Sequence, residues 1–153
     1  MATISINADL LEKYELKFQP QNISNSLFPT QILGFGEIST VFSIEHPEFD
    51  GLIFKRMPMF ETMSQSLAHE KLCHQYIDIL ENKIGIKTPD FACASISRND
   101  NTVVFYSIQK KLPSESIGSK VLHSLSDNEC IILFEKVLTT IKKIWDFSSQ
   151  SPQ

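Results

Sequence analysis

Lys55 and Glu70 are charged residues at positions where the surrounding pattern is apolar. Lys55 follows an Ile-Phe pair in the run LIFKRM, and Glu70 lies near the middle of the apolar stripe of a helical segment. A charge turned toward a core is costly unless an opposite charge and hydrogen bonds compensate it. We therefore expect the Lys55 ammonium to meet the Glu70 carboxylate in a cleft, where the ammonium can also bind an anion.

Each of these residues has a simpler explanation when it is taken alone. A lysine in a strand near a turn usually extends its ammonium into water, and a glutamate on a helix usually faces solvent. The joint interpretation is favoured by a stretch upstream, ILGFGEISTVF, which carries Gly34 and Gly36. Glycines at this spacing let backbone N–H groups approach phosphate oxygens without obstruction by Cβ atoms. A β-bulge or a twisted strand is the alternative explanation of the two glycines.

Two hairpins are expected to position these groups. The Asp50-Gly51 pair lies between two β-rich runs, 38–46 and 52–57, and both residue types accept the positive φ that tight hairpin turns need. Polar residues 98–101 separate a second pair of β-rich runs. Together with the strand that carries the glycines, these runs predict an antiparallel meander of about five strands.

Alternation along the second of these strands gives its two faces different chemistry. Ile53, Lys55 and Met57 fall on one face. Phe54 and Arg56 fall on the other. One face therefore combines a lysine with apolar side chains, which fits a cleft at the edge of a core.

Helices are predicted at about 7–17, at 61–83, and from Ser126 onward. Ser126 and Glu129 form a capping box at the start of the last helix. The order of strands, helix, strands and helix predicts an α+β fold, with a five-stranded antiparallel sheet, one packed helix and a C-terminal helix. The stripe of the middle helix consists of Met63, Leu67, Cys73, Ile77 and Leu80.

The order of these features resembles the N-terminal lobe of the protein-kinase-like superfamily, which includes protein kinases and the aminoglycoside and choline phosphotransferases. In that family a glycine-rich hairpin covers the phosphates, a lysine neutralises phosphate oxygens, and a helical glutamate holds the lysine. The resemblance implies that Lys55 binds the phosphates of ATP and that Glu70 anchors Lys55, with Mg²⁺ as the metal of a complete protein. The matching residues are Gly34, Gly36, Ser39, Val41, Lys55 and Glu70, with Ser39 in place of the family's third glycine.

The same resemblance implies contacts to the base of the nucleotide. The stretch YSIQKKLP takes the place of the hinge after the fifth strand, where backbone groups hydrogen-bond adenine. The connection ENKIGIKTPDF is closer to the small-molecule phosphotransferase branch than to typical protein kinases. An ordinary strand end explains Glu115 as well as a ribose contact does. The implied residues are Leu33 and Val41 on the two sides of the base, Ile108 behind it, the backbone of Gln109 and Lys111, and Glu115 beside the ribose.

Catalytic motifs of the family are not present. The sequence contains no His-Arg-Asp or His-Gly-Asp motif and no Asp-Phe-Gly. Because the resemblance covers about residues 30–147, the last helix corresponds to the first helix of a C-terminal lobe. We therefore expect an incomplete phosphotransferase that transfers no phosphate by itself. Its expected parts are an N-terminal extension (1–29), a nucleotide-binding lobe (30–112), and a linker with the first helix of an absent C-terminal lobe (113–153).

A non-enzymatic scaffold is the alternative from a different class. Without a C-terminal lobe over it, the last helix exposes an apolar stripe that includes Leu138, Ile141 and Trp145. Exposed apolar surfaces of this kind bind partner proteins or self-associate. If ATP stabilises the chain and Lys55→Ala abolishes this stabilisation, the nucleotide-binding lobe is favoured. If the chain dimerises and nucleotide has no effect on it, the scaffold is favoured.

Composition excludes several other classes. A chain of 153 residues that is 42% hydrophobic and carries a net charge of -4 forms a folded core and does not suit nucleic acid or an anionic membrane as its main partner. Three widely spaced cysteines without a CxxC pair argue against a disulfide framework. His69 and Cys73 stand one helical turn apart, but no further ligands accompany them, so no metal site is expected. The N-terminus lacks the apolar stretch of a signal peptide, which favours a cytoplasmic protein.

Overall fold

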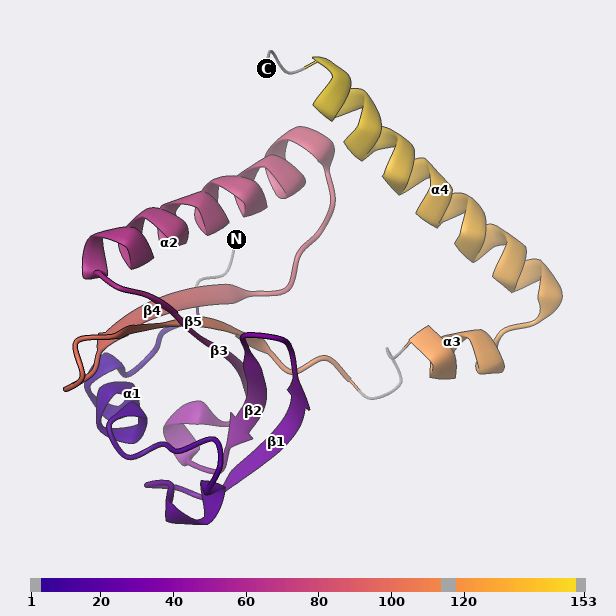
Figure 1. Ribbon diagram of the computed structural model, residues 1–153. Helices are drawn as coiled ribbons and strands as arrows, with labels where there is room; N and C mark the ends of the chain where they lie inside the picture. Colours follow the sequence, from indigo (N-terminus) through magenta and orange to yellow (C-terminus); the bar gives the residue numbers. More distant parts are fainter. Residues whose placement is uncertain (1–3, 114–117, 151–153) are drawn as a thin grey trace. The chain divides into compact units, whose positions relative to one another are not determined.

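The chain divides into two compact units, of which the larger contains a five-stranded antiparallel sheet (Figure 1). The computed structural model describes residues 4–113 and 118–150. The first unit comprises the described residues up to Gln75 together with Pro89–Lys111. The second comprises Tyr76–Thr88 and the described residues from Leu112 onward.

The sheet confirms the predicted α+β fold. Its strands lie in the order β1-β2-β3-β5-β4, and every neighbouring pair is antiparallel. The long helix α2 (Met63–Asp78) connects β3 to β4, as predicted. The strands are β1 (Thr30–Phe35), β2 (Thr40–Ile44), β3 (Leu52–Phe60), β4 (Phe91–Ser97) and β5 (Val103–Lys110).

Both predicted hairpins form, and positive φ angles occur in their connections. Gly51, with φ of 69°, ends the connection between β2 and β3, which also contains a short 3₁₀ turn over Pro47–Phe49. Asp50, for which the sequence also allowed a positive φ, has a φ of -59°, so the turn does not have positive φ at both positions. Asn101, with φ of 63°, lies in the polar turn between β4 and β5. Glycine and asparagine tolerate this left-handed conformation better than most residues, so the local sequence is sufficient to direct both turns.

The principal core lies between one face of the sheet and the N-terminal segment. This segment contains α1 (Ala8–Glu15), which begins with an Asn7 side chain that accepts a hydrogen bond from the Leu10 backbone N–H at 3.1 Å. The sequence-based division set residues 1–29 apart as an extension, but the described part of this segment packs in the same core as the strands. The fully buried members of this core are Leu11, Tyr14, Phe18, Phe42, Phe49, Phe54, Val104, Tyr106 and Ile108.

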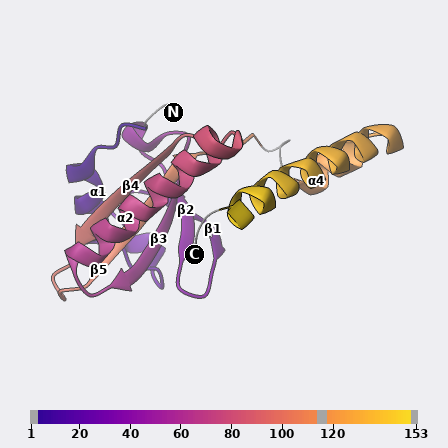
Figure 2. The same cartoon turned by 90° about the horizontal axis from the view of Figure 1, so that it is seen from above.

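Helix α2 packs on the opposite face of the sheet (Figure 1, Figure 2). The hydroxyls of Ser66 on α2 and Ser95 on β4 lie 2.7 Å apart in a hydrogen bond, and the ring of His69 lies edge-on to Phe105 of β5. Ser95 and Phe105 are directly opposite each other in the paired strands β4 and β5, so their side chains project from the same face of the sheet.

The predicted helix 61–83 continues past α2 as a π-helical turn. This turn covers Ile79–Ile84 and ends at Gly85, whose φ of 77° provides a left-handed C-cap. Asp78 accepts a hydrogen bond from the Asn82 side chain at 2.6 Å across the transition. The predicted end near Gly85 is therefore confirmed, although the last six residues do not keep α-helical hydrogen bonding.

The second unit contains α3 (Gly118–Ser124) and the long helix α4 (Asp127–Gln150). The Glu129 carboxylate accepts hydrogen bonds from the backbone N–H of Ser126 at 2.9 Å and from its hydroxyl at 2.6 Å. These bonds form the Glu129 half of the predicted capping box and place a negative charge at the positive end of the helix dipole. Among the described helices, none combines the length and the apolar character needed to cross a lipid bilayer.

Candidate functional site

A row of four side chains crosses the sheet at the position of Lys55. Lys55 pairs with Val41 of β2 on one side and with Ser107 of β5 on the other, and Ser107 pairs in turn with Cys93 of β4. Residues directly opposite one another in paired strands share a face. We refer to Val41, Lys55, Ser107 and Cys93 as the Lys55 row.

The Lys55 row lies on the face that α2 covers. Cys93 is two residues from Ser95, whose hydroxyl binds α2, and the thiols of Cys93 and Cys73 share a hydrogen bond. Burial raises the pKa of both thiols, and the nearby carboxylate of Glu70 adds to the increase. Lys55 and Glu70 are therefore presented on the same side of the sheet.

The predicted ion pair between Lys55 and Glu70 is not formed in the structure. Lys55 is exposed and makes no ion pair with any described residue. Glu70 instead lies 3.8 Å from the Nε2 atom of His74, one helical turn further along α2. Glu70 lies near Cys93, at the β4 end of the Lys55 row. Because β5 lies between β4 and β3, Cys93 is two strand spacings, or about 10 Å, from Lys55, and this distance explains why the ion pair is not formed.

A buried ionic cluster forms on the other face of the sheet, between Glu15 and three partners. The Glu15 carboxylate is completely buried and accepts hydrogen bonds from Arg56 Nε at 2.9 Å and from Arg56 Nη2 at 2.7 Å. Arg98 Nη1 and the Tyr106 hydroxyl also donate to this carboxylate. We refer to Glu15, Arg56, Arg98 and Tyr106 as the Glu15 cluster.

The pKa changes in the Glu15 cluster follow from burial and charge. Burial of the Tyr106 hydroxyl raises its pKa well above the usual value, and the Glu15 carboxylate raises it further. Burial disfavours the charged form of Arg56, but the hydrogen bonds and the charge of Glu15 outweigh this effect and raise its pKa. In this cluster the negative charge of the Glu15 carboxylate is shared by the guanidinium groups of Arg56 and Arg98.

The sequence led us to expect that the cation of β3 paired with a buried carboxylate would be Lys55, with Glu70. The structure has such a pair, but it consists of Arg56 and Glu15. Alternation along β3 had already placed Arg56 beside Phe54, on the face that is now seen to be buried. Glu15 follows Tyr14 in α1, and that position alone carried no sign of burial. A search for an internal acid to match Arg56 could have identified it.

The glycine hairpin contains both a tight turn and a β-bulge. The Gly36 N–H donates to the Ser39 carbonyl at 2.8 Å, and a Cβ atom on Gly36 would lie 2.5 Å from the Ser39 hydroxyl oxygen. The pairing of β1 with β2 shifts by one residue between Ile32 and Gly34. The alternative explanation of a bulge therefore accounts for part of the glycine pattern, and a side chain at position 36 would displace only the Ser39 hydroxyl.

A cavity of about 580 Å³ adjoins the tip of this hairpin. Residues 35–40 contribute one wall, and Arg56 and Arg98 of the Glu15 cluster contribute another. The hairpin tip therefore borders the Arg56 face, whereas Lys55 projects from the opposite face. Lys55 is not among the residues that line this cavity.

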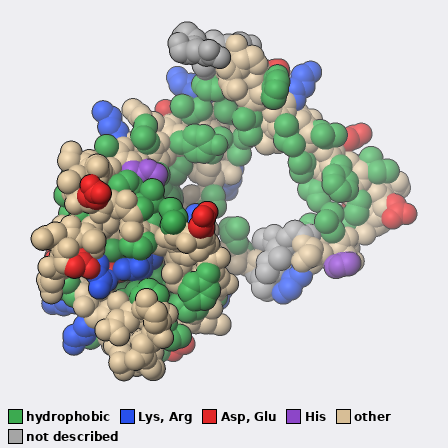
Figure 3. Space-filling model, viewed as in Figure 1, with side chains coloured by type: hydrophobic (Ala, Val, Ile, Leu, Met, Phe, Trp, Pro, Cys, Tyr) green, Lys and Arg blue, Asp and Glu red, His purple; other side chains and the backbone are tan. Residues whose placement is uncertain are grey.

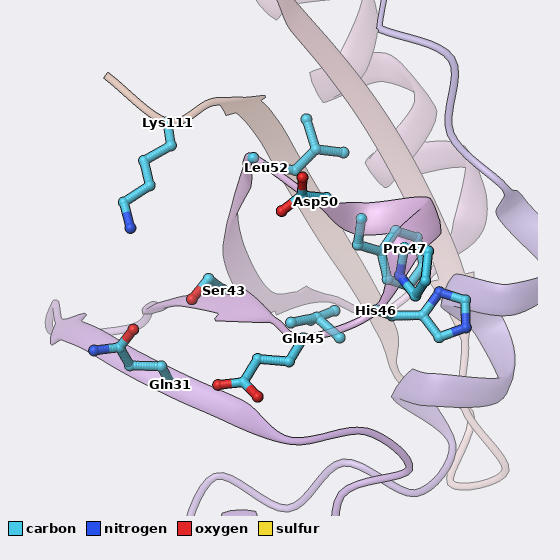
Figure 4. Close-up of a pocket in the computed structure, with 11 residues that line it drawn as sticks. Gln31, Ser43, Glu45, His46, Pro47, Asp50, Leu52 and Lys111 are labelled. Atoms are coloured by element: carbon cyan, nitrogen blue, oxygen red, sulfur yellow. The ribbon is translucent and has the colours of Figure 1, made fainter. Parts of the chain in front are cut away.

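A second cavity, of about 430 Å³, lies at the other end of β2 (Figure 4). Figure 4 shows Lys111 extending from the end of β5 on the side of Ser43 and Gln31. Ser43 is two residues from Val41, so it lies on the same face as the Lys55 row. This cavity is within the size range of sites for small ligands.

The residues predicted to contact a base are dispersed in the structure. Ile108 is completely buried opposite Phe54, in the core on the other face from Lys55, and Ser107 takes its place on the Lys55 face. The Lys111 N–H, predicted to bind adenine, donates to the Gly51 carbonyl at 2.8 Å.

Of the remaining base contacts, three are placed by the structure. Val41 and Gln109 are half-buried on the Lys55 face, and Leu33 is 44% exposed at the bulge. Glu115 lies outside the described residues. The local sequence carries no signal for Ser107 and Cys93, because their place in the row depends on the strand register.

Metal binding has no support in the described part of the chain. No three of its histidine, cysteine, aspartate and glutamate side chains are grouped so that they could hold an ion. His69, the residue considered for a metal, packs its ring against Phe60 and Phe105. It therefore has a packing function.

Comparisons of this chain with protein-family models, with curated protein sequences and with solved structures gave no match.

Proposed function

We propose that this chain is the nucleotide-binding lobe of a kinase-like phosphotransferase, with ATP as its ligand. The observation that supports this function best is the exposed Lys55 ammonium, which has no counter-charge among the described residues and lies in a row with Val41 and Ser107. A lysine in this state is able to bind a phosphate without first releasing a carboxylate.

The order of groups along the strands suits an extended ligand. On the Lys55 face, the Lys55 row is followed by Ile53 paired with Gln109, and Gly51 with Lys111 lies at the end of the strands. Lys55 and Gly51 are separated by four residues of extended strand, or about 13 Å. Phosphates near Lys55 would place the base toward the cavity that Ser43 and Lys111 line.

Glu70 has a positioning function in this proposal. Its carboxylate lies on the same side of the sheet as Lys55, and its ion-pair partner among the described residues is His74, at 3.8 Å. A change of side-chain rotamer at Lys55 would bring the ammonium toward Glu70 and leave its remaining donors for a phosphate. The acceptor of the phosphoryl group is not part of the proposal, because the sequence contains no catalytic-loop motif. Mg²⁺ enters only as the companion of ATP in a complete protein.

Thermal unfolding of the full chain with and without ATP tests the proposal. ATP at about 100 times its dissociation constant should add about 2.7 kcal/mol to the free energy of unfolding. Lys55→Ala should weaken ATP binding about tenfold or more, because it removes a charge-assisted contact. Lys17→Ala is the matched control, since Lys17 is also an exposed lysine of the first unit but follows α1.

Two outcomes would contradict the proposal. One is the absence of stabilisation by ATP at millimolar concentrations. The other is equal stabilisation of wild type and Lys55→Ala, which would place any bound nucleotide away from the Lys55 row. Stabilisation by ATP but not by adenosine would show that the phosphates provide the binding energy.

A non-enzymatic interaction module is the second candidate function. The specific observation in its favour is the apolar surface of α4, where Leu138 is 64% exposed and Trp145 is 73% exposed. Apolar side chains of this size are rarely left in water unless they form an interface.

A further inference from the structure

Helix α4 exposes apolar side chains (Figure 3), and those of its middle turns form a stripe. The spacing of three and four residues places these side chains on one face of the helix. All of them are between 38% and 73% exposed. They are Phe134, Val137, Leu138, Ile141, Ile144 and Trp145, which we call the α4 stripe.

The contacts of α4 within its own unit are on its other side. Lys143, Asp146 and Phe147 line a small cavity together with Lys83 and Ile84 of the π-helical turn. At 100° per residue these three positions of α4 lie on the side of the helix away from Ile141. The packing of α4 against this turn therefore leaves the stripe uncovered.

The area of the α4 stripe is comparable to half of a small dimer interface. Six large apolar side chains that are about half exposed offer roughly 600 Å² when neighbouring aliphatic stems are included. Two such surfaces bury roughly 1,200 Å², which is the lower end of the range for stable protein interfaces.

Charges beside the stripe favour a second copy of the same helix in antiparallel orientation. Glu135 and Lys142 lie seven residues apart on the same flank of the stripe, and neither makes an ion pair with a described residue. The middle of Asp127–Gln150 falls halfway between these two residues. When two copies pair antiparallel about that point, each Glu135 is opposite the Lys142 of the other copy. In a parallel pair they are about 10 Å apart along the axis.

We infer that the chain forms a homodimer through an antiparallel pair of α4 helices, with the α4 stripes in contact and two symmetric Glu135–Lys142 ion pairs. This inference rests on the second candidate function and names its partner. It does not depend on nucleotide binding. Antiparallel helices also align their macrodipoles favourably.

Sedimentation of the full chain over a range of concentrations tests the dimer. Wild type should change from monomer to dimer as concentration increases. Ile141→Glu should raise the dissociation constant more than about a hundredfold, because it places two carboxylates in the apolar contact. Ile132→Glu is the matched control: Ile132 is 51% exposed, Ile141 is 54% exposed, and nine residues place them on opposite sides of the helix.

The orientation is tested by exchanging charges. Glu135→Lys and Lys142→Glu should each weaken the dimer about fivefold, and the double exchange should restore it. A wild type that stays monomeric at high micromolar concentration would overturn the inference and leave the stripe to a different partner. So would a dimer that Ile141→Glu leaves intact. A dimer that is insensitive to both single exchanges would overturn the antiparallel pairing.

The dimer and the nucleotide proposals fail independently. Loss of ATP stabilisation in Lys55→Ala is measured in a unit that does not contain α4. Loss of dimer in Ile141→Glu, with ATP stabilisation unchanged, would support both proposals.

Discussion

Replacement of Glu15 by glutamine is expected to destabilise the first unit severely. Glutamine has nearly the same shape as glutamate, so packing of Leu11 and Tyr14 around it should be retained. The change removes the charge that Arg56 and Arg98 share. The Arg56 side chain is only 7% exposed, so water cannot replace the lost partner.

The magnitude follows from this burial. Removing one partner of a buried ion pair costs about 3–5 kcal/mol, because an uncompensated charge remains. The cluster retains the amide as a weaker acceptor, so we expect a loss near the lower value, about 3 kcal/mol. In a unit of about 100 residues, this loss lowers the melting temperature by about 12 °C or more.

Urea denaturation followed by circular dichroism measures this loss. The control is Glu12→Gln, since Glu12 is an exposed glutamate three residues earlier on α1. We expect Glu12→Gln to change the free energy of unfolding by less than about 0.5 kcal/mol. A loss below about 1 kcal/mol in Glu15→Gln, or equal losses in both variants, would refute the assignment of Glu15 as the buried centre of the cluster.

Three further predictions concern titration and backbone geometry. Burial raises the pKa of Tyr14 to about 12, whereas the tyrosine of the unfolded chain loses its proton from about pH 10. The free energy of unfolding, measured with denaturant, should therefore fall between pH 10 and pH 12, and it should fall less in Tyr14→Phe. Burial also raises the pKa of the Cys73 and Cys93 thiols, so their alkylation rates, followed by mass spectrometry, should still increase above pH 9, where an ordinary thiol levels off. Gly36→Ala should change the free energy of unfolding by less than about 0.5 kcal/mol, because its Cβ atom would meet only the Ser39 hydroxyl, at 2.5 Å, and a rotamer change moves that hydroxyl away, whereas Gly51→Ala, at a φ of 69°, should cost about 1 kcal/mol in thermal unfolding.

The sequence alone was sufficient for features that depend on neighbouring residues. The Asp50-Gly51 pair directed the connection between β2 and β3, and Ser126 with Glu129 capped α4. Alternation along β3 correctly separated Lys55 from Arg56. These features are predictable because backbone conformation and hydrogen bonds within a few residues decide them.

The local sequence does not predict which face of the sheet the N-terminal segment covers. Both faces of β3 combine apolar residues with one cation, so the local pattern suits either Lys55 or Arg56 as the buried charge. The decision comes from α1, whose Glu15 pairs with Arg56 from 41 positions away and with Arg98 from 83 positions away. Such a pairing depends on the whole packing of the core.

The sequence by itself therefore predicted the strands, the helices α1, α2 and α4, and the two faces of β3, but not the short helix α3. Only the tertiary structure decided that the compensated charge is Glu15 with Arg56, and that Lys55, paired with Ser107 across the strands, makes no ion pair with a described residue. The physical reason is range. Turns and caps are local equilibria of a few residues, whereas strand register and burial of charge depend on contacts that exist only when distant segments are packed together.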